Sequence, residues 1–239
     1  MDPAADTNDA IWKSVQLVQD RELKADERTR KNAAQWRLMG ELLPFDTQDA
    51  FTFVDLGAGT GSATREILRL YPQSTAILTD FSAPMMAVGE VEMAPFAGRF
   101  RYLEFDMSTN DWPAALPRTL DAIVTSMCVH HLPDHRKEGL FAEIFDHLAP
   151  GGWYLNYDSV RSADRLVTDA WQRVIDLDPE ALRKRLHGTT VERARRENHR
   201  RYLIPLPQQL DYLRAAGFEG IDVYWKHLDD VIYGGCRPA

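Results

Sequence analysis

The stretch Val54-Asp55-Leu56-Gly57-Ala58-Gly59-Thr60-Gly61 decides the fold of this 239-residue chain. An apolar run over 51–56 predicts a strand, and helical periodicity begins at Ser62, so the glycines occupy a strand-to-helix turn. Glycine lets the backbone bend sharply and lets a ligand approach the bare main chain. Ser62 stands where a dinucleotide fingerprint needs its third glycine, and no Gly-Lys-Ser/Thr of a P-loop is present. The G-x-G-x-G spacing therefore suits a nucleoside without presenting a lysine to phosphates.

Strand and helix patterns alternate after this turn, which is typical of a parallel sheet with crossover helices. The expected strands cover residues 51–56, 75–79, 99–105, 120–126 and 153–157. The first two expected helices cover residues 62–70 and 83–91, the second with Ser82 as its N-cap. A third helix is expected to begin at Asp134, its N-cap, and to end before Pro150-Gly151-Gly152. A helix around 206–213 closes at Gly217. Two last strands, 220–226 and 230–234, are joined by a turn too short for a crossover and should pair antiparallel.

The pattern divides the chain into four segments. Residues 1–50 form an N-terminal helical cap, 51–158 the nucleoside-binding core, 159–203 a helical insertion, and 204–239 a helix and strand pair that complete the sheet. Ligands of open α/β sheets bind at the carboxyl ends of the strands. Because the insertion follows the fifth strand, we expect it to lie over that edge, and we call it the lid.

Acidic residues end the second and third strands. Asp80 ends the strand after the glycine loop, where a carboxylate can accept hydrogen bonds from both ribose hydroxyls of a nucleoside. Asp106 ends the next strand, where an adenine amino group could donate to it. Either acid alone is more often a turn former. Three aligned strand ends, one with glycines and two with acids, favour a nucleoside site instead.

Together these motifs resemble the class I S-adenosylmethionine-dependent methyltransferases. The resemblance covers about residues 51–157 and the two terminal strands, and its motifs lie at 55–61, 80–86, 105–107, 121–132 and 148–152. It implies a Rossmann-like α/β fold with helices on both faces of a seven-stranded sheet, in the order 3-2-1-4-5-7-6 with strand 7 antiparallel. It implies S-adenosylmethionine as cofactor and S-adenosylhomocysteine as product. The implied cofactor-binding residues are Asp55, Gly57, Ala58, Gly59, Gly61, Asp80, Phe81, Met85, Asp106, Met107 and Ser126.

Methyl transfer from a sulfonium needs mainly alignment and exclusion of water, with a base only where the acceptor is protonated. His130 and His131, beyond the fourth strand, are the candidate bases because histidine titrates near neutral pH. We expect no metal, because none of the usual zinc spacings is met. The candidates for the acceptor pocket are Trp36, Tyr157, Arg196 and Tyr202.

Charge is distributed unevenly along the chain. The net charge of −8 argues against wholesale wrapping by nucleic acid or an anionic membrane. Residues 181–201 nevertheless hold eight Lys or Arg and two Glu, a net charge of +6, which leaves −14 on the rest. A solvated helix face explains such a stretch, as does a carboxylate-bearing substrate gripped by arginine. An RNA phosphate track is a third reading, which we do not favour because few aromatic residues interleave there.

The sequence leaves rival functions open. Residues 129–134, 156–158 and the basic stretch also resemble carboxy-S-adenosylmethionine synthases, which act in tRNA wobble-uridine modification, although Ala58 and Thr60 depart from the pattern between their glycines. A non-catalytic nucleoside-binding module is the other alternative. No membrane-spanning run or targeting signal is evident, and two cysteines cannot form a disulfide framework, which favours the cytoplasm. A homodimer is compatible with the sequence, which does not fix the oligomeric state.

Overall fold

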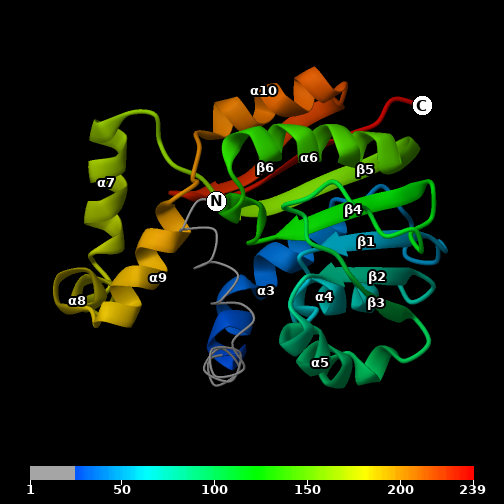
Figure 1. Ribbon diagram of the computed structural model, residues 1–239, viewed down its shortest axis with the longest axis horizontal. Coiled ribbons are helices and arrows are strands. Elements are labelled where there is room, and N and C mark those ends of the chain that lie inside the picture. Colours follow the sequence, from blue (N-terminus) through cyan, green and yellow to red (C-terminus); the bar gives the residue numbers. More distant parts are fainter. Residues whose placement is uncertain (1–24) are drawn as a thin grey trace.

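The computed structural model describes residues 25–239, which form a seven-stranded sheet with helices on both faces (Figure 1). The strands follow the order β3-β2-β1-β4-β5-β7-β6. Their bounds are β1 Thr52–Leu56, β2 Thr75–Asp80, β3 Phe100–Glu104, β4 Leu120–Ser126, β5 Leu148–Ser159, β6 Glu219–His227 and β7 Asp230–Cys236. The first five strands pair in parallel, whereas β7 is antiparallel to β5 and β6. The fold class, the strand order and the antiparallel terminal pair expected from the sequence are confirmed.

Two layers of helices sandwich the sheet. The helices of the core are α3 Ala25–Glu41, α4 Ser62–Leu70, α5 Ala83–Glu92, α6 Asp134–His147 and α10 Leu206–Ala216. Short 3-10 turns, η1 Ala94–Phe96 and η2 Val129–His131, follow α5 and β4. Side chains from α6 and α10 pack with one face of the strands, and side chains from α3 and α4 pack with the other.

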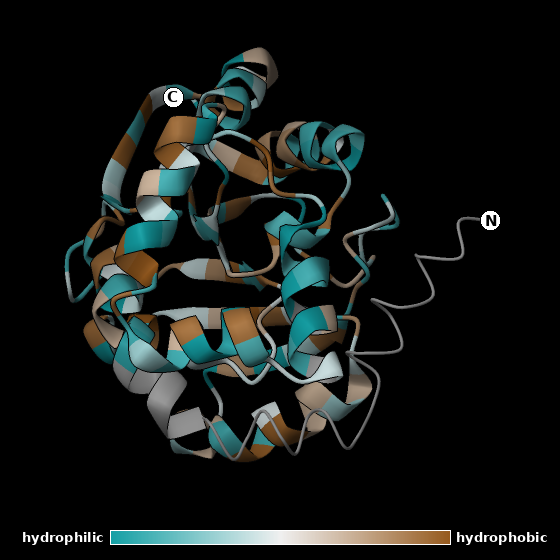
Figure 2. Cartoon of the chain, turned by 90° about the vertical axis from the view of Figure 1, so that its left-hand side faces the viewer, coloured by the Kyte–Doolittle hydropathy of each residue, from teal (hydrophilic) through white to brown (hydrophobic). Residues whose placement is uncertain are grey.

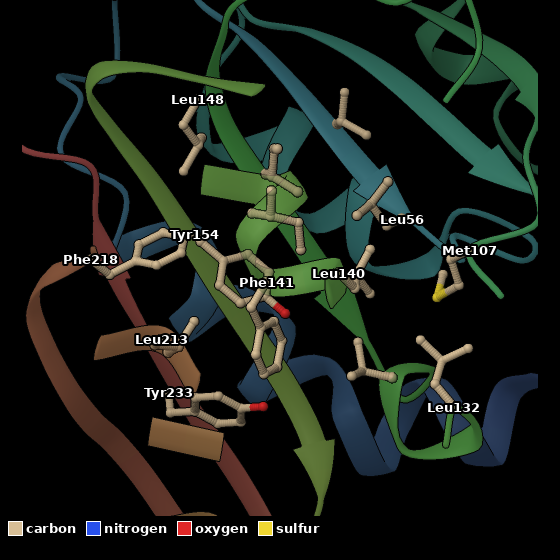
Figure 3. Close-up of a cluster of buried hydrophobic side chains, with 14 of the residues drawn as sticks. Leu56, Met107, Leu132, Leu140, Phe141, Leu148, Tyr154, Leu213, Phe218 and Tyr233 are labelled. Atoms are coloured by element: carbon tan, nitrogen blue, oxygen red, sulfur yellow. The ribbon is translucent and has the colours of Figure 1, made fainter. Parts of the chain in front are cut away.

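Alternation along the strands explains these two cores. In β1, Val54 and Leu56 face the α6 side while Phe53 faces the α3 side, as the two-residue period of a strand requires. Figure 3 shows the α6-side cluster, in which Phe141 and Leu140 from α6 meet residues of β5, β7 and α10. All of these strand residues are fully buried, which accounts for the apolar runs from which the strands are predicted.

Two details differ from the sequence expectation. The N-cap of α6 is Pro133, which has an extended backbone, so Asp134 is the first helical residue and not the cap. Strand β5 begins at Leu148 and not at Trp153, because Leu148 pairs with Leu120 of β4 and the Gly152 carbonyl accepts the Arg237 amide. Other local signals are confirmed. Ser82 caps α5 by accepting from the Met85 amide.

The segment between β5 and α10 forms three helices, α7 Arg165–Ile175, α8 Pro179–His187 and α9 Thr190–Arg200. They stand beside the carboxyl ends of the strands, at the left in Figure 1. Figure 2, which views this side, shows hydrophilic and hydrophobic stretches interleaved along the helices. Within the lid, Arg185 bonds both oxygens of Asp176, and Thr189 and Glu192 form a capping box at the start of α9. Within residues 25–239 we find no helix with the length and apolar character of a membrane span.

Candidate functional site

The glycine loop is held against the end of β2. The amide of Ala58 donates to the Thr79 carbonyl at 2.9 Å, and the amide of Gly59 donates to Asp80 Oδ2 at 2.8 Å. Gly57 has φ +70°, in the left-handed region that favours glycine. A Cβ at Gly57 would lie only 2.8 Å from Cys128 Sγ and from Met107 Cε. Glycine is thus required there by backbone conformation and by space, as the sequence predicts for a loop that a ligand approaches.

Asp80 is a buried carboxylate, 7% exposed, at the end of β2. Its Oδ1 accepts the Ser82 amide at 2.8 Å while Oδ2 holds Gly59. These bonds fix the orientation of the carboxylate at the rim of the sheet. An ionised carboxylate has about four acceptor positions, so holding the loop is compatible with accepting ligand hydroxyls as well.

Asp55 lies directly before the loop and is 1% exposed. Its Oδ2 accepts the Thr64 hydroxyl at 2.6 Å, whereas its buried Oδ1 has no partner among the described residues. Burial raises the pKa of Asp55 to about 7, against the lowering effect of the Thr64 bond. A buried acceptor without a partner beside a glycine loop fits a ligand that brings a donor or a positive charge, as S-adenosylmethionine does.

The residues that follow β3 lie near the glycine loop. Phe105 is buried, and the half-buried Asp106 accepts the Ser108 amide at 2.9 Å through Oδ1. The Met107 side chain reaches the space above Gly57, and the Met85 side chain from α5 reaches that above Gly59. The ends of β1, β2 and β3 therefore converge as expected, and their residues fit the nucleoside portion of the cofactor.

A second polar group lies at the ends of β4 and β5. His130 Nδ1 and Asp158 Oδ1 are 2.5 Å apart, and the His130 amide donates to Asp158 Oδ2 at 2.8 Å. Both side chains are buried, and His130 Nε2 has no partner among the described residues. The ring of His131 lies 4.0 Å from that of His130, centroid to centroid. A carboxylate on Nδ1 keeps the proton there and leaves the lone pair on Nε2, the arrangement of a histidine base.

His199 of α9 brings the lid into this group. Its ring meets the His130 ring edge to face, with centroids 4.5 Å apart. Burial, with a further contribution from His130, lowers the pKa of His199 to about 4, so this ring is neutral at pH 7.

Lys137 fastens the end of the lid to the loop that carries the histidines. Its fully buried ammonium donates to the carbonyls of Leu132 and Tyr202, both at 2.5 Å. Burial is the main reason that the pKa of Lys137 is lowered to about 8. The two carbonyls belong to segments far apart in sequence, so this side chain ties the end of the lid to the loop after β4.

The four residues expected in the acceptor pocket do not share one surface. Trp36 and Tyr157 are buried in the α3-side core, where the Trp36 indole donates to Ser126 Oγ at 2.7 Å and the Tyr157 hydroxyl to Asn32 at 3.2 Å. Ser126, expected at the cofactor, therefore contacts α3. Arg196 donates to the Lys184 carbonyl inside the lid. The Tyr202 ring lies under the Arg201 guanidinium, 5.1 Å away.

Sequence reasoning assigned no role to several residues of the site. Asp158 is recognisable as a strand-end acid, but its pairing with His130 depends on the β4–β5 register. No sequence signal distinguishes His199 and Lys137 from other basic residues. No cluster of three or more His, Cys, Asp or Glu arranged for a metal ion occurs among residues 25–239.

Comparisons with known proteins agree with this geometry. A family model described as a methyltransferase domain matches residues 53–152. The chain is 34% identical over 128 residues to a trans-aconitate 2-methyltransferase of Azoarcus sp., covering 54% of this chain and 44% of the relative. It is 30% identical over 192 residues to the enzyme of that name from Pseudomonas aeruginosa, covering 77% and 66%. The chain thus spans less than two thirds of either relative.

A solved structure shows the same fold. Human N-acetylserotonin methyltransferase in complex with S-adenosylmethionine aligns with a TM-score of 0.68 and 17% identity, over 99% of this chain and 60% of that one. This likeness concerns the arrangement of the sheet and helices. The matched domain contains the glycine loop, Asp80 and Asp106, the residues whose geometry suits a nucleoside. Residues 53–152 match a methyltransferase domain, and the relatives and the fold support the class I S-adenosylmethionine-dependent methyltransferase family for this chain.

Proposed function

We propose that this protein binds S-adenosylmethionine at the ends of β1, β2 and β3 and transfers its methyl group to an oxygen atom of a small molecule. The observation that carries the proposal is the convergence on one rim of the Gly57 turn, the Asp80 carboxylate and the Asp106 loop. In this arrangement Asp80 binds the ribose of the cofactor and Asp106 binds its adenine. Asp55 lies toward the positively charged end of the cofactor. When bound, the cofactor supplies an electrophilic methyl group on a good leaving group.

The His130–Asp158 pair supplies the proton acceptor. Asp158 accepts from Nδ1 and so directs the lone pair of Nε2 away from the carboxylate. His130 takes the proton of an acceptor hydroxyl at Nε2 as the new O–C bond forms, and Asp158 stabilises the imidazolium that results. A positioned base of this kind contributes about 10²- to 10⁴-fold to the rate. His199 of the lid packs on the His130 ring and so shields that side of the ring from water.

This arrangement favours a hydroxyl acceptor over a carboxylate. The relatives from Azoarcus and Pseudomonas are named for a carboxylic acid substrate. A carboxylate is already ionised at pH 7 and needs no base, whereas a phenolic or enolic hydroxyl does. In the lid, Arg183 and Arg185 pair with acidic residues, and Arg196 donates to a backbone carbonyl. These internal bonds also favour a structural role for the basic stretch over an RNA track. The methyltransferase relatives give no support to the synthase or to a non-catalytic module.

The test is a turnover assay on the full chain with S-adenosylmethionine and matched pairs of phenols and carboxylic acids. We expect S-adenosylhomocysteine and an O-methylated phenol, both identified by mass spectrometry, only when a phenol is present. Turnover confined to carboxylic acids would reverse the choice of acceptor. A carboxylated sulfonium formed with prephenate would support the synthase, and cofactor binding without turnover on any acceptor would leave a binding module.

A further inference from the structure

We infer that Arg136 is a positioning residue that fixes the loop after β3 against α6 and so sets the cofactor's adenine edge. This inference rests on the proposed function, because it assumes that adenine meets Asp106. Arg136 belongs to the first turn of α6 and is 9% exposed.

The guanidinium of Arg136 donates to two carbonyls of the loop. Its Nε donates to the Met107 carbonyl at 2.7 Å, and its Nη2 donates to the Thr109 carbonyl at 2.6 Å. These carbonyls lie one and three residues beyond Asp106, whose side chain accepts the Ser108 amide. The guanidinium therefore binds the backbone of the loop, while the Met107 side chain extends toward Gly57.

Glu143, two turns along α6, holds the guanidinium in turn. Arg136 Nη1 and Nη2 reach the two Glu143 carboxylate oxygens, each at 2.7 Å. Glu143 Oε2 also accepts the Trp112 indole N–H at 2.8 Å, and the Trp112 ring stacks on His147 with centroids 4.0 Å apart. The beginning and the middle of the loop are thus tied to α6.

Only an arginine can make this set of contacts, because its planar fork presents donors in three directions at once. A lysine at position 136 keeps the charge but offers a single ammonium on a flexible stem. It could pair with Glu143 or reach one carbonyl, and the loop would be left free to shift. The expected consequence is weaker binding of the adenine ring with the ribose contacts of Asp80 intact.

The test is a double-mutant cycle on the full chain, with S-adenosylhomocysteine affinity measured by calorimetry. We expect Arg136→Lys and Asp106→Ala each to weaken binding about tenfold, and the double variant to bind no more than about twofold more weakly than the weaker single variant. Non-additivity is expected because Arg136 acts through Asp106. The inference would be overturned if the double variant bound S-adenosylhomocysteine about a hundredfold more weakly than the wild type, the product of two independent losses. It would also be overturned if Arg136→Lys bound with full affinity.

A second ligand separates positioning from general damage. S-inosylhomocysteine carries an oxygen in place of the adenine amino group, and the wild-type protein should discriminate against it. Arg136→Lys should lose most of this discrimination, which simple destabilisation would not change. Should Arg136→Lys fold poorly, Glu143→Gln retains Arg136 but removes the carboxylate charge that orients its guanidinium, and it should give a smaller loss of discrimination in the same direction. Retained discrimination in that variant would also count against the inference.

Arg214→Lys is the matched control, since Arg214 is exposed on α10 and pairs with Asp211 of the same helix. We expect it to bind S-adenosylhomocysteine like the wild type. If the wild-type protein itself shows no binding, the proposed function fails. If the wild type binds but the effects of the two substitutions are additive, the proposed function stands and only the role given to Arg136 is wrong.

Discussion

The two ends of the site are built differently. At the cofactor rim, formed by the ends of β1–β3, Asp80 and Asp106 each accept an amide two residues further along the chain. At the acceptor rim, formed by the ends of β4–β5 and the lid, the bonds join residues 28 apart in His130–Asp158 and 65 apart in Lys137–Tyr202. The cofactor rim also has the longer-range bond from Gly59 to Asp80, but its local turns can be recognised in sequence, whereas the distant pairs of the acceptor rim appear only in the folded chain.

The largest difference between the rims should appear on removing the base. We expect His130→Ala to lower kcat about 10²- to 10⁴-fold with a hydroxyl acceptor, because a positioned base contributes about that much to the rate and the variant lacks the imidazole that Asp158 orients. Affinity for S-adenosylhomocysteine should stay within about twofold, since the cofactor rim is untouched. Steady-state kinetics and calorimetry measure the two effects. His135→Ala, an exposed histidine on α6, is the control, and equal turnover in both variants would contradict the assignment.

The cofactor rim should make the unliganded protein sensitive to pH through Asp55. The folded-state pKa of Asp55 is about 7, above its ordinary value of 3.8, so between these values the native state binds more protons than the unfolded state. Stability should therefore fall as pH rises through this window, by on the order of 3 kcal/mol.

Asp55→Asn removes that titration and still accepts the Thr64 hydroxyl. We expect urea unfolding to show the variant gaining stability over the wild type between pH 5 and pH 7.5. A difference between variant and wild type that is the same at both pH values would show that Asp55 does not titrate in this range.

Loss of the ribose contact should weaken binding and leave the acceptor rim intact. We expect Asp80→Ala to raise the dissociation constant of S-adenosylmethionine at least about tenfold, because a charge-assisted pair of hydrogen bonds contributes about 1.5–3 kcal/mol. At saturating cofactor, kcat should change little. Asp111→Ala, an exposed loop acid, is the control. An unchanged dissociation constant would refute the ribose assignment.

Lys137 connects the lid to the histidine loop, and its removal should loosen the acceptor rim alone. In Lys137→Met the carbonyls of Leu132 and Tyr202 lose their buried donor. We expect amides of residues 200–204 to exchange at least about fivefold faster, as the loss of about 1 kcal/mol of local stability implies. Lys184→Met, on the exposed side of α8, should leave exchange unchanged. Equal protection in both variants would argue against a fastening role.

The smallest effect is expected at Arg196. Because its guanidinium donates to Lys184 O within the lid, Arg196→Ala should change the acceptor KM by no more than about twofold. A tenfold rise in KM confined to acidic acceptors would instead show that Arg196 grips a carboxylate, and would bring back the anionic substrate expected from sequence.

Periodicity and turn residues were sufficient to predict the sheet. Buried runs such as Leu120–Ser126 and the glycine turn after Leu56 carry their own signals, and the short turn before Asp230 requires the antiparallel pair. The start of β5 at Leu148 could not be predicted, because its pairing with Leu120 and the bond between Gly152 and Arg237 involve distant partners.

The same contrast holds within the site. Asp80 and Gly57 could be predicted as site residues because each stands in a local turn at the end of a strand, although the bond between Asp80 and Gly59 joins residues 21 apart. His130 could be named as a base, but its partner Asp158 depends on the β4–β5 register, and His199 reaches it only through the fold of the lid. Arg196, chosen for its charge, contacts the lid's own backbone because guanidinium groups also bind carbonyls.

Titration calorimetry of the wild-type chain with S-adenosylhomocysteine is the most direct test of the central claim that the ends of β1, β2 and β3 form one nucleoside site. We expect saturable binding of one ligand per chain, and at least about tenfold weaker binding in Asp80→Ala. A well-folded protein that gives no binding heat with either this ligand or S-adenosylmethionine at several temperatures would contradict it.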